Sequence, residues 1–305
     1  MMQKLASKES MRTTVIGSHP LSFDRLGPQA VIQSVEEQIA AGIQLVSDGQ
    51  TRGDMISVYT GVLTGMEIRG EGADRKMHIN GRIGPGDFSW MIEDMALARR
   101  TAGARARVKA DMTGPVTLAF SSILDTKEYA GYRDRRLYMD IAGALRELAR
   151  GYGEAGADQL QIDEPFFSVG VPMELAREAV EHLAAGFEGE TALHVCGDIS
   201  KVFDRLLHFS GIQVLSHGFA GTRSNLDLID RGKLEDAQKI LGFGCIDTAS
   251  ERVETVGETA ALIRKGIALA GRENMVIHPD CGLRALPHDV AVAKLGAMCA
   301  AARMA

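Results

Sequence analysis

Short apolar runs typical of buried β-strands recur along the chain, and most are separated by stretches in which apolar residues repeat with helical spacing. Residues 138–154 and 173–186 are two such helical stretches, rich in Ala, Leu, Glu and Arg. The eight strand-like runs cover residues 13–18, 43–49, 107–114, 157–164, 192–197, 212–220, 240–247 and 275–281. This pattern predicts a (β/α)₈ barrel, with a doubly wound open sheet as the competing architecture.

Polar side chains gather at or just past the carboxyl ends of these runs. A strand end is often polar simply because the chain leaves the core there, but that explanation is weaker when it must hold for every run. In a barrel the carboxyl ends open on one face, where active sites are built, so the distribution favours the barrel. The residues are Ser18, Asp48, Gln50, Asp111, Asp163, Glu164, His194, Cys196, His217, Asp247, Asp280 and Cys281.

The longest departure from the strand–helix rhythm lies between the second and third runs. Residues 66–69 and 76–79 flank a Gly-rich turn, which predicts a β-hairpin insertion at about residues 62–88. The sequence contains no internal repeat, linker or low-complexity segment. We therefore expect residues 1–305 to form a single barrel domain.

Composition narrows the possible partners. The chain has 305 residues, 45% of them hydrophobic, and a formal net charge of −6 without a run of Lys and Arg. This balance argues against a nucleic-acid partner or an anionic membrane surface and favours a small-molecule substrate. The first 12 residues lack an apolar stretch suited to secretion, and no segment is apolar enough to span a membrane. We expect a cytoplasmic protein.

The candidate chemistry centres on one histidine and two of the four cysteines. His194 and Cys196 stand two residues apart on one predicted strand, so their side chains point the same way. Cys281 closes the last run, too far along the chain for a compact zinc-finger pattern. One imidazole and two thiolates favour Zn²⁺, and three ligands with an open position are typical of a catalytic site. Cys245 and Cys299 are expected to be small buried residues.

Five short motifs at the strand ends extend this picture: residues 16–18 (IGS), 113–117 (TGPVT), 162–165 (IDEP), 194–197 (HVCG) and 279–283 (PDCGL). In this order they resemble the catalytic half of cobalamin-independent methionine synthase, from about residue 13 to the C-terminus. The resemblance implies a barrel of the uroporphyrinogen-decarboxylase type that transfers a methyl group to homocysteine to give methionine. It also implies zinc bound by a His, a Cys, an acidic residue and a second Cys.

The sequence departs from the family at the acidic zinc ligand. Gly218 stands where the resemblance places a Glu, and glycine has no side chain to coordinate a metal. We prefer a three-ligand set of His194, Cys196 and Cys281. The alternatives are weak zinc binding or recruitment of His217, which would need a bulge because His217 should face the opposite side of the strand.

The resemblance also suggests how homocysteine would be held. It places Asp163 on the ammonium group, with Gln50 nearby, while Ile16, Gly17 and Ser18 offer backbone and hydroxyl donors to the carboxylate. The long methionine synthases have a Glu at the position of Gln50. The substitution removes one negative charge but retains a hydrogen-bond acceptor.

The methyl donor and the proton donor differ from the long enzymes. The proton-donating His near the seventh strand is absent, and Asp247 in the corresponding stretch is expected to handle protons. The chain resembles the short form, without the additional half that helps to bind polyglutamylated methyltetrahydrofolate. Both features favour a methylated corrinoid, free or protein-bound, with methyltetrahydrofolate as the other donor. Two alternatives are alkyl transfer to another thiol such as coenzyme M, and a degenerate metal-free homologue with a binding role.

Overall fold

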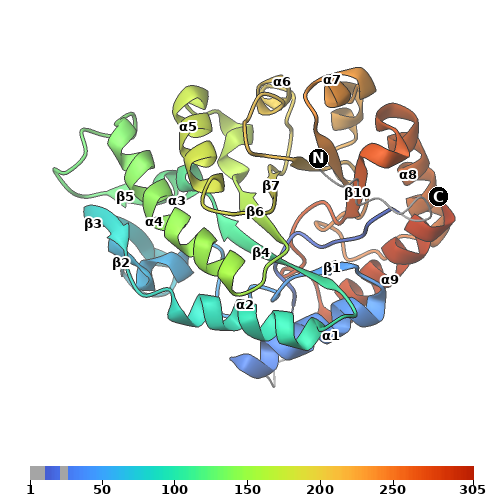
Figure 1. Cartoon of the computed structure of the whole chain (residues 1–305), viewed down its shortest axis with the longest axis horizontal. Helices are drawn as coiled ribbons and strands as arrows, with labels where there is room; N and C mark the ends of the chain where they lie inside the picture. The colour runs from blue at the N-terminus through green and yellow to red at the C-terminus, as the bar shows by residue number, and fades with distance from the viewer. Residues whose placement is uncertain (1–10, 21–26) are drawn as a thin grey trace.

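The computed structural model describes residues 11–20 and 27–305, and its centre is a curled parallel sheet (Figure 1). Each strand pairs in parallel with the next in the order β1-β4-β6-β7-β8-β9-β10. The strands are β1 (Leu45–Val46), β4 (Arg107–Thr113), β6 (Gln159–Asp163), β7 (Glu190–His194), β8 (Val214–Gly218), β9 (Ile240–Gly244) and β10 (Met275–His278).

Residues 13 and 14 join the two edges of this sheet. Thr13 bridges Ile277 of β10, and Thr14 bridges Leu45 of β1, both in parallel. The Thr14 amide donates to the Ile277 carbonyl at 2.8 Å, and the Leu45 amide donates to the Thr13 carbonyl at 3.1 Å. The ring is therefore closed, which confirms the predicted (β/α)₈ barrel and excludes the open sheet. All eight predicted strand runs contribute to it, although the first forms only these two bridges.

Helices surround the strands, as expected for a parallel sheet buried on both faces (Figure 1). Their apolar stripes face the barrel: α4 (Arg135–Glu154), for example, buries Leu137, Ile141, Leu145 and Leu148. Local signals determine where several helices begin, such as the capping box of Thr255 and Glu258 at the start of α8 (Val256–Ala270). The helices are α1 (Pro28–Ala41), α2 (Ser89–Ala102), α3 (Pro115–Phe120), α4 (Arg135–Glu154), α5 (Met173–Ala184), α6 (Phe203–Leu206), α7 (Arg231–Asp236), α8 (Val256–Ala270) and α9 (His288–Met304).

A second, three-stranded sheet lies outside the barrel sheet. Two of its strands come from the region between β1 and β4, and the third follows α3. The antiparallel strands β2 (Leu63–Arg69) and β3 (Lys76–Pro85) make a hairpin, and β5 (Ser122–Leu124) adds in parallel to β3. The hairpin packs beside α4 (Arg135–Glu154). In addition, the Ile83 amide donates to the hydroxyl of Tyr129, in the segment before that helix, at 2.8 Å. The 3-10 turn η1 (Ser57–Gly61) leads into it from the end of β1.

The barrel interior is polar towards the carboxyl ends of the strands. Lys109 on β4 is fully buried, and its ammonium group donates to Gln161 Oε1 at 2.5 Å and to the Val15 carbonyl. His278 on β10 also points inward; a β-carbon on Gly242 would lie 2.7 Å from its Nε2, so glycine makes room for the imidazole. Among the described residues we find no helix with the length and apolar character needed to cross a bilayer.

Candidate functional site

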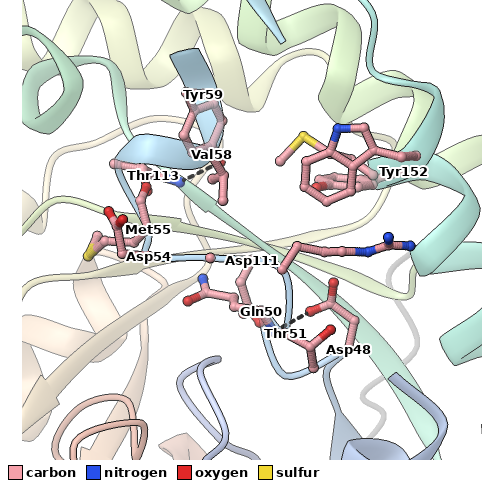
Figure 2. A pocket seen from close by; sticks show the side chains of 14 residues that line it. Asp48, Gln50, Thr51, Asp54, Met55, Val58, Tyr59, Asp111, Thr113 and Tyr152 are labelled. Atoms are coloured by element: carbon pink, nitrogen blue, oxygen red, sulfur yellow. Dashed lines mark hydrogen bonds between the residues drawn. The ribbon is translucent and has the colours of Figure 1, made fainter. Parts of the chain in front are cut away.

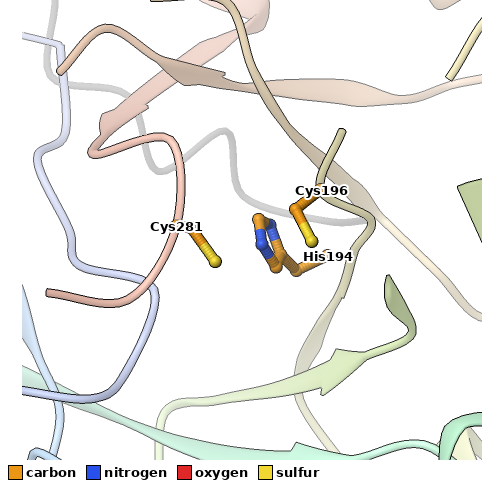
Figure 3. Close-up of side chains that lie close together, drawn as sticks. All are labelled: His194, Cys196 and Cys281. Atoms are coloured by element: carbon orange, nitrogen blue, oxygen red, sulfur yellow. The ribbon is translucent and has the colours of Figure 1, made fainter. Parts of the chain in front are cut away.

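One imidazole and two sulfur atoms converge at the carboxyl end of the barrel (Figure 3). His194 is the last residue of β7, Cys196 follows two residues later, and Cys281 comes from the loop after β10. One ligand atom from each side chain lies within 4.8 Å of the other two. His194 is 2% exposed, and both cysteines are partly buried and free. The structure thus brings together the three residues predicted to hold a metal.

A buried hydrogen-bond chain fixes the orientation of the His194 ring. His278 Nδ1 lies 2.7 Å from the Pro279 carbonyl, so this nitrogen must carry the proton, and His278 Nε2 accepts from Ser216 Oγ at 2.9 Å. Ser216 Oγ is then free to accept from His194 Nδ1 at 3.2 Å. This arrangement leaves the lone pair on His194 Nε2, the tautomer that a metal ligand requires.

The electrostatics of the three residues favour a cation between them. His194 Nε2 is buried and has no hydrogen-bond partner in the described part of the chain. Burial lowers the pKa of His194, but the neighbouring Cys281 sulfur outweighs it and raises the pKa. A hydrogen bond between the sulfurs lowers the pKa of Cys196 against the effect of burial, while the same bond and burial raise the pKa of Cys281. A divalent cation would stabilise both thiolates, and the donor set fits Zn²⁺.

Asp280 occupies the volume beside Gly218, where the family would place its acidic ligand. A β-carbon on Gly218 would lie 3.0 Å from Asp280 Cγ. The Asp280 carboxylate accepts backbone hydrogen bonds from Phe219 and Ala220 at 3.0 Å and from Gly221 at 2.6 Å. Burial raises the pKa of Asp280 to about 6 although these donors oppose it. The sequence marked Asp280 as polar without a role, and the structure shows that it fills the space that Gly218 leaves.

His217 does not approach the metal ligands, so the alternative in which it replaces the acidic ligand is wrong. Its ring lies edge-on to Phe203 of α6, with centroids 5.8 Å apart, and its Nδ1 lies 3.0 Å from the Val195 carbonyl. The register of β8 with β9 runs without a bulge from Val214 to Gly218. Burial lowers the pKa of His217 to about 4. Regular strand alternation therefore turns this side chain to the outer face of the barrel.

The residues predicted to hold the substrate lie around the same mouth. Gln161 Nε2 donates to both the Ile16 carbonyl and Asp163 Oδ1 at 2.7 Å, which ties the loop at residues 16–18 to the predicted ammonium ligand. Gln50 has φ +48°, a left-handed conformation that costs energy outside glycine and often occurs at functional sites. A β-carbon on Gly17 would lie 3.2 Å from Gln50 Cδ. Gly17 therefore allows Gln50 to approach more closely than a residue with a β-carbon would.

Asp247 lies at the mouth near Asp280. A β-carbon on Gly221 would be 3.3 Å from both Asp247 Oδ1 and Asp280 Oδ2, so the two carboxylates flank one point. The Ala249 amide donates to Asp247 Oδ1 at 2.9 Å. The site also contains two residues for which the sequence suggested no role, Lys109 and Asp111, whose side chains form an ion pair at 3.3 Å. Their alternation along β4 is the signal that could have placed both inside the barrel.

A second group of metal-ligand atoms lies between the first barrel strand, α1 and α9. His19, Glu37 and His288 also bring one ligand atom each within 4.8 Å. Here the ligand atoms already bond to one another, because His19 Nε2 and His288 Nε2 lie 2.7 and 2.9 Å from Glu37 Oε2. This group is a hydrogen-bonded clamp, unlike the His194 group, whose Nε2 faces sulfur without a hydrogen bond.

Comparison with known proteins gives the same family. Residues 24–304 match the family model described as "Cobalamin-independent synthase, Catalytic domain". The chain is 40% identical to a methionine synthase of Methanothermobacter thermautotrophicus, covering 96% of this chain and 99% of that protein. It is 32% identical to a methionine synthase of Methanocaldococcus jannaschii over the same shares of the two chains.

Solved structures share the fold. A B12-independent methionine synthase from Shewanella sp. W3-18-1, in complex with selenomethionine, superposes with a TM-score of 0.84 at 24% identity, covering 97% of this chain and 98% of that one. A putative vitamin-B12 independent methionine synthase from Listeria monocytogenes gives 0.74 at 15% identity, with the same coverage. On the family match and the identity to its relatives, the chain belongs to the cobalamin-independent methionine synthase family, as a catalytic domain.

Proposed function

We propose that this protein is a zinc-dependent methyltransferase that acts on the thiol of homocysteine and gives methionine. The proposal depends on the state of His194 Nε2. This atom is buried and faces the sulfurs of Cys196 and Cys281, and it carries a lone pair because the hydrogen bond to Ser216 places the proton on Nδ1. The names of the relatives, and the selenomethionine bound to the Shewanella enzyme, support the same substrate class.

Each part of the amino-acid thiol has a counterpart in the site. A Zn²⁺ held by His194, Cys196 and Cys281 would lower the pKa of the incoming thiol and retain the thiolate for in-line attack on the methyl group. Asp163 would bind the ammonium group, and the loop at residues 16–18 would bind the carboxylate. Ser216 and His278 would hold the imidazole in the ligand tautomer.

The donor is proposed to be a methylcorrinoid, with methyltetrahydrofolate as the second candidate. Asp247 lies at the barrel mouth beside Asp280. With methyltetrahydrofolate as donor it would supply the proton that the departing nitrogen requires, whereas a demethylated corrinoid would leave as Co(I) without a proton. The free thiols of the site require a reducing compartment, so we propose a cytoplasmic enzyme.

Metal analysis and single-turnover assays test this function together. We expect about one equivalent of zinc in the metal-replete protein and less than about half in Cys196→Ser, with Cys299→Ser as the matched control because Cys299 is buried away from the site. Zinc-loaded protein should form methionine from homocysteine with methylcobalamin or methyltetrahydrofolate.

The alternatives predict other outcomes. Methyl transfer to coenzyme M but not to homocysteine would contradict homocysteine as the substrate, while zinc-dependent transfer to a thiol would stand. Zinc below half an equivalent, unchanged by Cys196→Ser, would contradict the catalytic metal and favour a metal-free binding role.

A further inference from the structure

Asp111 projects from β4 into an open pocket between β4, α2 and the segment that follows β1 (Figure 2). The side chains around it include Gln50, Arg52, Tyr59, Trp90 and Tyr152. Asp111 is only 8% exposed, yet neither of its carboxylate oxygens has a hydrogen-bond partner within the described residues. Its ion-pair partner is Lys109, whose ammonium group lies 3.3 Å from Oδ1 without the geometry of a hydrogen bond. A buried carboxylate in this state is costly and calls for an explanation, such as a bound ligand.

The carboxylate of Asp111 shares a space with Gln50. A β-carbon on Gly17 would lie 2.9 Å from Asp111 Oδ2 and 3.2 Å from Gln50 Cδ, so both side chains pack against the same face of Gly17. The same loop, residues 16–18, is tied to Asp163 through the two hydrogen bonds of Gln161. Asp111 therefore stands next to the proposed amino-acid site.

The charges around this space are out of balance. Burial raises the pKa of Asp111 well above its ordinary range although Lys109 opposes it, and the charge of Asp163 on the neighbouring strand adds to the shift, so the ionised form of Asp111 needs a further cation. Lys109, which lies 3.3 Å from Asp111 Oδ1, also donates to Gln161 Oε1 and the Val15 carbonyl. Two carboxylates thus share one ammonium group that is already divided among three acceptors. A second cation would neutralise the excess negative charge.

We propose that Asp111 binds the α-ammonium group of the substrate together with Asp163, supplying from β4 the negative charge that Gln50 lacks. The inference rests on the proposed function and deepens it, because it makes Asp111 a determinant of specificity for amino-acid thiols over thiols without an ammonium group. A purely structural role as partner of Lys109 would affect the binding of both kinds of ligand equally.

The test compares two ligands that differ only in the ammonium group: L-methionine and 4-(methylsulfanyl)butanoate. Their affinities for the zinc-loaded protein are measured by calorimetry. We expect methionine to bind at least about tenfold more tightly to the wild type, and Asp111→Asn to reduce that preference at least about tenfold with unchanged zinc content. The control Asp236→Asn, which removes an exposed carboxylate at the end of α7, should behave as the wild type.

A rescue variant sharpens the result. In Asp111→Asn/Gln50→Glu the charge returns on the side chain that packs beside residue 111 against Gly17, and the preference for methionine should recover. If Asp111→Asn does not fold, a crystal structure of the wild type with methionine decides instead. Its nitrogen should lie within about 3.2 Å of an Asp111 oxygen, and a separation beyond about 4 Å would overturn the inference.

The outcomes separate the inference from the proposed function. A methionine preference that Asp111→Asn leaves unchanged, or equal affinity of the wild type for both ligands, overturns the role of Asp111 while methyl transfer to a thiol stands. Failure of the wild type to bind either ligand overturns the substrate assignment and this inference with it.

Discussion

Ser216→Ala should weaken metal binding without touching any metal ligand. Ser216 is 2% exposed, and its hydroxyl connects His278 Nε2 at 2.9 Å with His194 Nδ1 at 3.2 Å. Removing the hydroxyl breaks both hydrogen bonds and frees the His194 tautomer. Loss of such an outer partner typically reduces metal affinity by about 10- to 100-fold, which corresponds to about 1.4–2.7 kcal/mol.

The same substitution should lower the stability of the metal-free protein, because two ring nitrogens lose their buried partner. A buried polar group left without a hydrogen bond costs about 1–3 kcal/mol. Zinc affinity is measured by competition with a chromophoric chelator, and the free energy of unfolding by urea titration. Ser122→Ala is the matched control: Ser122 is 3% exposed and donates to the Leu118 carbonyl at 2.8 Å, outside the metal site.

A folded Ser216→Ala that bound zinc within about threefold of the wild type would contradict this prediction. That result would mean that the His194 ring needs no fixed tautomer, and the case for a prearranged ligand would fail. A loss of affinity in Ser122→Ala of the same size would assign the effect to general destabilisation.

The remaining predictions concern the neighbouring groups. Gly17→Ala should reduce methionine affinity at least about tenfold in calorimetry with unchanged zinc content, because its β-carbon would meet the carboxylate 2.9 Å away. Gly218→Glu should lower the free energy of unfolding by about 1–3 kcal/mol without tighter zinc binding, because Asp280 fills the space; tighter binding would contradict this. Cys281→Ser should lose zinc yet retain cooperative thermal unfolding, since the core does not depend on the metal; non-cooperative unfolding would contradict this. Burial raises the pKa of Glu37, but hydrogen bonds from His19, Gln33 and His288 lower it to about 2, below the ordinary 4.5. The ionised Glu37 carboxylate therefore stabilises the folded protein above pH 4.5, and this contribution is lost as the pH falls towards 2. Glu37→Gln should accordingly lower Tm more at pH 6 than at pH 2.5. An equal decrease at both pH values would show that the charge is not involved.

The strands and their order could be predicted because a parallel barrel repeats one simple pattern. Each buried run ends in a polar residue, and this places His194, Cys196 and Cys281 at one mouth before any coordinates are known. Strand alternation likewise shows that His217 faces away from the ligands. The run at residues 13–18 belongs to that prediction, but the sequence does not reveal that it closes the ring through only two bridges, at Thr13 and Thr14.

The site details that the sequence did not reveal depend on packing between distant strands. That Asp280 fills the space beside Gly218 follows from the contact between the loops after β8 and β10, which no local pattern encodes. Asp111 was visible as a polar strand end, but its lack of hydrogen bonds becomes evident only when the cavity around it is assembled. The Ser216–His278 chain is similar, since the two residues are far apart in sequence and meet inside the barrel.

X-ray absorption spectroscopy of the zinc-loaded protein tests the central claim most directly. We predict a first shell with two sulfur atoms at about 2.3 Å and an imidazole nitrogen at about 2.0–2.1 Å. A shell of nitrogen and oxygen alone would contradict this prediction.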